Sequence, residues 1–147
     1  MRRTIKAEAT IAARPETIFA CLTDYEQADV FIEGLQKLDP LGVQTAGEGA
    51  RFSAVLSLGG RFVHTTIVIA SLRPGRLVTW ASVGDEGQSL TFELAPDETG
   101  TTVKLAVAYE EPGGIAGALI APFVERTVQH RADTALERLG KEVSPDS

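Results

Sequence analysis

The chain has 147 residues, 44% of them hydrophobic and 23% charged, and 14 basic against 20 acidic side chains give a net charge of −6. This length suits a single hydrophobic core, so we expect one domain over residues 1–147. The excess negative charge repels phosphate backbones and argues against a nucleic-acid partner. The sequence has no run of 18 or more apolar residues, so it predicts no transmembrane helix.

Cysteine content and the N-terminal segment indicate the compartment. The lone Cys21 permits no disulfide within the chain and no cysteine-based zinc site. The basic N-terminus turns directly into an alternating pattern, without the apolar region of a signal peptide. The best local set of metal ligands is His130 with Asp133, fewer than the three or four that a site needs. We therefore expect a cytoplasmic protein without a metal or cofactor.

The first forty residues predict one strand and two short helices. Residues 4–11 alternate between apolar and polar, which is typical of a half-buried strand. Pro15 stands where a helix can begin, and an apolar stripe follows it to about residue 24. A second short helix is expected from about residue 26 to 33, where Gly34 ends it.

Six further strands and a long helix follow. The apolar segments are separated by glycine and proline turns such as Gly59-Gly60, Asp85-Glu86-Gly87 and Pro112-Gly113-Gly114. We place the strands at residues 35–44, 49–58, 61–72, 76–83, 88–95 and 101–110. The helix is expected over residues 115–140, about 39 Å long at about 1.5 Å per residue, with Pro122 either kinking it or marking its effective start.

The strand over residues 61–72 is apolar on both faces, so the pattern alone does not determine which side faces the core. If the even-numbered residues face inward, His64 and Thr66 face the long helix. Apolar residues on the opposite face then predict a weak homodimer through the outer sheet surface or an edge strand.

The order of these elements, with its turns, resembles the START-like or Bet v 1-like (SRPBCC) superfamily, and specifically its polyketide cyclase/dehydrase branch. The resemblance covers nearly the whole chain and is carried by short segments at residues 13–19 (ARPETIF), 22–25 (LTDY), 47–52 (GEGARF), 73–80 (RPGRLVTW) and 100–103 (GTTV).

This resemblance implies an α+β helix-grip fold, in which a seven-stranded antiparallel sheet wraps around the C-terminal helix and two short helices close one end of an apolar cavity. The superfamily includes lipid carriers, receptors, aromatases, cyclases and co-chaperones. Membership therefore implies a fold and no particular reaction.

Aromatic and amphipathic side chains predict a pocket for a small hydrophobic ligand of the lipid, polyketide or aromatic type. The alternative for each residue is ordinary core packing. We also expect Phe123 to be the most important packing residue of the long helix. The candidate ligand-binding residues are Phe31, Phe52, Leu56, His64, Thr66, Trp80, Phe92, Tyr109, Phe123, Thr127 and His130.

A cyclase, aromatase or dehydratase is the catalytic alternative. His64 or His130 would move protons in a general acid/base scheme, while Tyr109 and Arg131 would orient or polarise a carbonyl. Cys21 lies in an apolar helical stripe and is more typical of a small hydrophobic residue than of a nucleophile. Because no complete catalytic set occurs, a binding function is favoured over an enzyme. A third alternative is a co-chaperone or protein-interaction module, for which we expect a collapsed cavity.

Overall fold

The computed structural model describes residues 2–58, 60–84, 87–111 and 113–144. They form an antiparallel sheet of seven strands in the order β1-β7-β6-β5-β4-β3-β2, with one long helix and three short helical segments. This architecture confirms the predicted helix-grip fold. In chain order the elements are β1 (Arg2–Ile11), α1 (Pro15–Leu22), η1 (Tyr25–Gln27), α2 (Ala28–Phe31), β2 (Leu35–Pro40), β3 (Arg51–Leu58), β4 (Arg61–Arg73), β5 (Leu77–Ser82), β6 (Ser89–Asp97), β7 (Gly100–Glu110) and α3 (Gly114–Val143).

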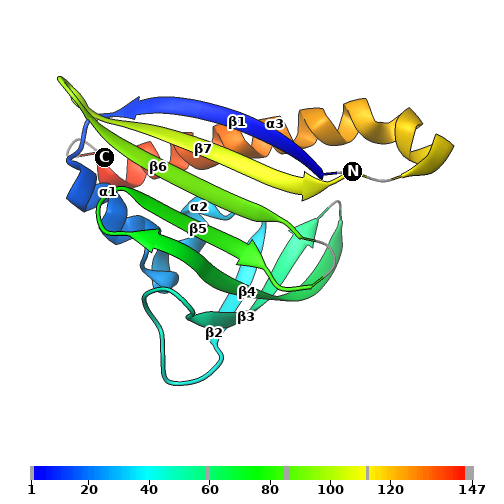
Figure 1. Ribbon diagram of the computed structural model, residues 1–147, viewed down its shortest axis with the longest axis horizontal. Helices are drawn as coiled ribbons and strands as arrows, with labels where there is room; N and C mark the ends of the chain where they lie inside the picture. The colour runs from blue at the N-terminus through cyan, green and yellow to red at the C-terminus, as the bar shows by residue number, and fades with distance from the viewer. Residues whose placement is uncertain (1, 59, 85–86, 112, 145–147) are drawn as a thin grey trace.

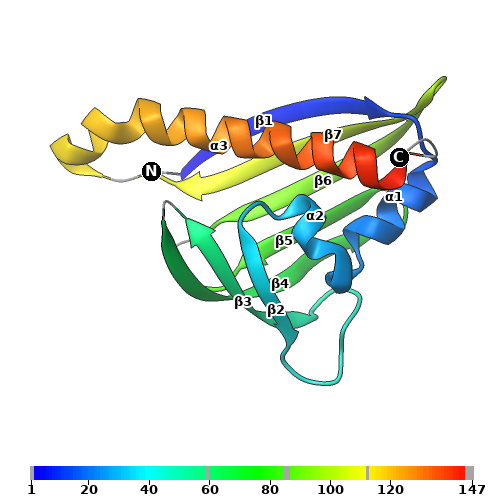
Figure 2. The same ribbon diagram turned by 180° about the vertical axis from the view of Figure 1, so that it is seen from behind.

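The sheet curls and α3 runs along its concave side (Figures 1 and 2). The short helices α1 and α2 lie beside the C-terminal half of α3, whereas the N-terminal turns of α3 extend past the ends of β1 and β7 (Figure 1). The long helix therefore has a covered half and a projecting half. Among the described residues, the structure contains no helix with the length and apolar character needed to cross a bilayer.

Several element boundaries differ from those predicted. The strand predicted over residues 35–44 ends at Pro40, and α3 begins at Gly114, so Pro122 lies within the helix and does not mark its start. Gly100 ends the β6–β7 turn with a φ of 152°, where a Cβ would collide with the carbonyl oxygen of Ile11, so glycine is required there. Gly59, Asp85, Glu86 and Pro112, which belong to predicted turns, lie outside the described residues.

The structure explains why strand β4 is apolar on both faces. Ile67 and Ile69 point into the core, and a bulge between Ile69 and Ser71 shifts the alternation so that Leu72 packs against the core as well. The odd-numbered residues before the bulge are therefore the inward ones. The even-numbered alternative is therefore wrong, and His64 and Thr66 lie on the outer face of the sheet.

The position of an inward-facing residue along its strand decides whether it packs in the core or lines a cavity. Near α1, the inward residues Phe52 on β3, Val78 on β5 and Phe92 on β6 are fully buried and pack together in the hydrophobic core. Farther along β3 and β6, Leu56 and Leu90 face inward as well but line a cavity. The covered half of α3 closes the core with Leu136 and Leu139.

Candidate functional site

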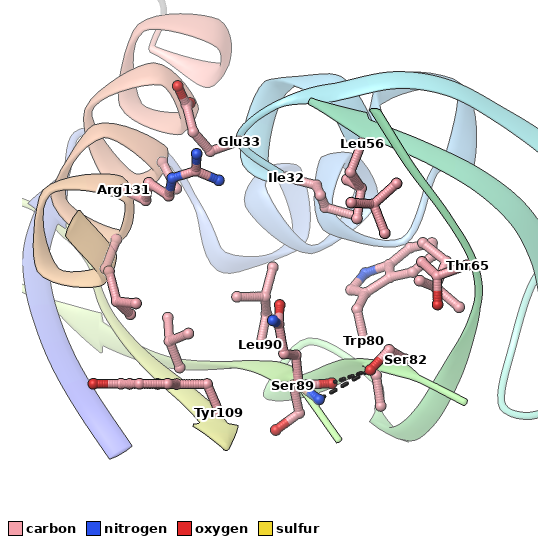
Figure 3. Close-up of a pocket in the computed structure, with 18 of the residues that line it drawn as sticks. Ile32, Glu33, Leu56, Thr65, Trp80, Ser82, Ser89, Leu90, Tyr109 and Arg131 are labelled. Carbon is pink, nitrogen blue, oxygen red and sulfur yellow. Dashed lines mark hydrogen bonds between the residues drawn. The ribbon is translucent and has the colours of Figure 1, made fainter. Parts of the chain in front are cut away.

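A cavity of about 630 Å³ lies between the concave face of the sheet and α3 (Figure 3). Its volume is within the range of small-molecule pockets. Strands β3 to β7 supply one wall, α3 supplies the other, and α2 with the residues after it closes the inner end. Most of the wall is apolar, as shown by Leu56, Val63, Ile67, Trp80, Leu90, Leu105, Val107, Val124, Val128, Ala132 and Ala135.

Aromatic rings form the inner end of the cavity. Phe31 packs at 5.9 Å from Trp80 and at 5.6 Å from Phe92, and Phe52 lies 5.6 Å from Trp80, measured between ring centroids. Phe31 and Trp80 line the cavity, whereas Phe52 and Phe92 are behind them in the core. The packed aromatic rings therefore form an apolar surface at the inner end of the cavity, which a ligand can contact.

Two apolar side chains that line the cavity are also open to solvent. Phe123 on α3 is 65% exposed and Val83, just after β5, is 44% exposed. Gln88 stands nearby, and its main-chain N–H donates a hydrogen bond of 2.9 Å to the Ser82 hydroxyl (Figure 3). These residues mark a mouth between the projecting half of α3 and the β5–β6 connection.

Polar groups in the wall are few and lie mainly near α3 and the mouth. Arg131 is partly buried and faces the cavity (Figure 3). Thr127 donates its hydroxyl proton to the Phe123 carbonyl oxygen at 3.0 Å, which leaves the hydroxyl oxygen free to accept a hydrogen bond. Tyr109 presents its ring to the cavity, while its hydroxyl points toward β1 (Figure 3).

Some of the residues that the sequence predicted for the pocket line the cavity, and others do not. Five of the predicted side chains stand apart from the cavity lining: Phe52 and Phe92 are core residues, His64 and Thr66 face outward from β4, and His130 is exposed on α3. The cavity lining contains Phe31, Leu56, Trp80, Tyr109, Phe123, Thr127 and Arg131.

Several lining residues were missed by sequence reasoning. Val63 and Thr65 were missed because the facing of β4 was unresolved, although Thr65 is a polar residue on the same face as Val63. Val128 and Ala132 recur at helical spacing from Val124, and that spacing was the signal that could have found them.

Neither histidine lines the cavity, which removes the proton-transfer scheme that relied on His64 or His130. The predicted packing role of Phe123 is also wrong, since its side chain is mostly exposed. Burial raises the pKa of the Cys21 thiol to about 11, with Glu142 and Asp24 adding to the effect, so the thiol is protonated at neutral pH. In the part of the chain that the structure describes, no group of three or more His, Cys, Asp or Glu side chains is placed to hold a metal ion.

A family model described as "Polyketide cyclase / dehydrase and lipid transport" matches residues 2–144. The chain belongs to this family. The match confirms the resemblance to the SRPBCC superfamily and spans the sheet, the short helices and α3. No curated protein matches the sequence significantly.

Solved structures share the fold of this polyketide cyclase family member at low sequence identity. TTHA0849 from Thermus thermophilus has 22% identity and a TM-score of 0.79, covering 96% of this chain and 97% of that one. The Zhui aromatase/cyclase from Streptomyces sp. R1128 has 14% identity and a TM-score of 0.78, covering 97% and 94%. A START superfamily protein from Mycobacterium smegmatis has 13% identity and a TM-score of 0.75, covering 95% and 96%. Likeness at this level shows the fold alone.

Proposed function

We propose that this protein binds a small hydrophobic ligand, of the lipid, polyketide or aromatic type, in the cavity between the sheet and α3. The observation that carries the proposal is the cavity itself: about 630 Å³ of space with a mostly apolar wall. If the cavity contained only water, its apolar wall would be hydrated, which is unfavourable. A bound apolar molecule would remove that surface from water. Membership in a family whose description includes lipid transport supports the same function.

An enzyme of the cyclase type has less support. Its proton-transfer residue would be His64 or His130, and both stand apart from the cavity wall. Tyr109 and Arg131 do line the cavity, but the Tyr109 hydroxyl points away from it toward β1 and a guanidinium stays protonated, so neither supplies a general base there. A collapsed cavity, expected for a co-chaperone or interaction module, is at odds with the open volume.

The sequence also supports proposals on compartment and partners. We propose a cytoplasmic location, supported by the lone, buried Cys21, and a weak homodimer, supported by Phe62, which is 68% exposed on β4. The net charge of −6 supports the absence of a nucleic-acid partner. Sedimentation at tens of micromolar protein tests the dimer, and a monomer there contradicts it.

Binding is tested with the neutral fluorophore N-phenyl-1-naphthylamine and with native mass spectrometry of freshly purified protein. We expect saturable binding of the probe, or displacement of a co-purified apolar molecule. A Val128→Trp variant fills the cavity and should weaken binding about tenfold or more. His130→Trp on the same helix adds the same ring outside the cavity and should leave affinity unchanged. Wild-type protein that carries no apolar molecule and binds no probe contradicts the proposal.

A further inference from the structure

Arg131 is a cation in a wall that is otherwise mostly apolar. It lies on α3 one turn from Val128 and Ala135, both of which line the cavity, and it is itself partly buried (Figure 3). A guanidinium in such a place loses part of its hydration, and that loss is offset when an anion or several acceptors bind it.

The acidic side chains of the cavity wall do not pair with Arg131. Glu33 also lines the cavity, but its carboxylate accepts a hydrogen bond of 3.1 Å from Arg138 on α3. Glu110 follows the inward-facing Tyr109 on β7, so its side chain is directed to the opposite face of the sheet. Within the described residues, no carboxylate lies at ion-pair distance from the Arg131 guanidinium.

The geometry points to an anionic amphiphile as the ligand class: an apolar body that fills the cavity, with one carboxylate or comparable acidic group paired to Arg131. We infer this from the uncompensated guanidinium, and the inference rests on the proposed binding function. A planar guanidinium offers two parallel N–H donors to a carboxylate, in a pairing stronger than a hydrogen bond between neutral groups.

The rest of the wall fits such a ligand. Thr127 lies one turn before Arg131 on the cavity side of α3, so its hydroxyl oxygen stands beside the same end of the ligand. The apolar wall and the rings of Phe31 and Trp80 would receive the body. At about 30 Å³ for each non-hydrogen atom, the cavity holds roughly 20 such atoms, the size of a medium-chain fatty acid or a two-ring to three-ring aromatic acid.

The test uses N-phenyl-1-naphthylamine as a neutral reporter of cavity occupancy and measures its displacement at pH 8 by dodecanoate and by dodecan-1-ol. These competitors share one chain and differ in charge at the end group. We expect dodecanoate to displace the reporter about tenfold better than the alcohol in wild-type protein. Arg131→Gln should reduce this preference to about twofold or less, while reporter affinity stays within about twofold.

Two control variants isolate the role of the charge. Arg126→Gln removes an exposed guanidinium from the same helix, outside the cavity wall, and should keep the wild-type preference. Arg131→Lys keeps a cation and should retain a measurable part of it. Circular dichroism shows whether each variant is folded, and the wild-type comparison decides even if Arg131→Gln does not fold.

Each outcome distinguishes the inference from the proposed function. Equal displacement by acid and alcohol, or a preference that survives Arg131→Gln, overturns the anionic ligand class while reporter binding leaves the proposed function standing. Wild-type protein that does not bind the reporter, and carries no apolar molecule in native mass spectrometry, overturns both. A preference for the acid that is lost in Arg131→Gln and kept in Arg126→Gln supports the inference.

Discussion

Trp80 on β5 donates a hydrogen bond from its indole Nε1 to the main-chain oxygen of Leu22, at 2.9 Å, where α1 ends. Both residues are buried. The bond ties the short helices to the sheet and holds the indole so that its ring lines the cavity. One side chain thus connects the closed end of the fold to the candidate site.

Replacing Trp80 by Phe should therefore destabilise the protein. Phe keeps only one of the two fused rings, which leaves a small void, and the buried Leu22 carbonyl loses its donor; the lost donor alone typically costs about 1 to 3 kcal/mol. Urea unfolding measures the loss. Thr79→Val is the control, because the Thr79 hydroxyl bonds Thr91 at 3.0 Å in a partly exposed position, and we expect a change below about 1 kcal/mol. An equal decrease in the free energy of unfolding in the two variants would contradict a particular contribution of the indole hydrogen bond to stability.

Side-chain truncation should destabilise the protein strongly in the covered half of α3 and only slightly in the projecting half. Leu139 is fully buried in the covered half, so Leu139→Ala should cost about 2 to 5 kcal/mol. Phe123 is 65% exposed in the projecting half, so Phe123→Ala should cost less than about 1 kcal/mol. Denaturant midpoints at constant slope report both values. A Phe123→Ala variant as unstable as Leu139→Ala would mean that the projecting half packs against protein in solution.

Variants of Thr127 and His130 should show that ligand binding can change without a change in stability. Both are exposed residues of α3, but only Thr127 is part of the cavity wall. We expect Thr127→Ala to change ligand affinity or selectivity and to alter the free energy of unfolding by less than about 1 kcal/mol. His130→Ala should change neither. Probe titrations and urea unfolding on both variants give the answer; a strongly destabilised Thr127→Ala with normal binding would identify Thr127 as a packing residue.

Cys21 should make stability fall at alkaline pH. Its thiol pKa rises from 9.0 to about 11 on folding, because burial disfavours the thiolate. Between these values the unfolded chain loses a proton that the folded chain retains, so the unfolded state is favoured as pH rises. The free energy of unfolding should drop over this range by up to about 2 to 3 kcal/mol more in wild-type protein than in Cys21→Ala. Parallel pH curves for the two proteins would rule out this coupling.

Local chemistry was enough to predict the order of elements. Alternating apolar residues identified β1, and turn glycines such as Gly100 separated the strands where the backbone needs a positive φ. Pro15 marked the start of α1. The second helix ends at Phe31, before the predicted stop, and Gly34, with a φ of 84°, lies in the turn that leads into β2. These features act over a few residues, so they are readable without knowing what packs against them.

The site depended on relationships between distant segments. The hydrophobic signal that singled out Trp80, Phe31 and Leu56, which line the cavity, also singled out Phe52 and Phe92, which belong to the core. Apolar character says that a side chain leaves water and does not say whether it meets protein or empty space. Only the depth of a residue along the curled sheet decides that.

The sequence by itself determined the order of strands, short helices and long helix, because strand period, turn residues and an amphipathic helix are local signals that agree with one another, and the helix-grip fold followed from the family resemblance which that order carries. The tertiary structure alone decided which residues face the cavity. In β4 the side chains alternate with period two and a bulge shifts their phase after Ile69, so facing had to be set by the neighbouring strands, and it turned His64 outward. On α3, the end of the sheet decided that Leu139 is core and Phe123 is exposed, since an apolar helix face is buried only where a sheet lies opposite it.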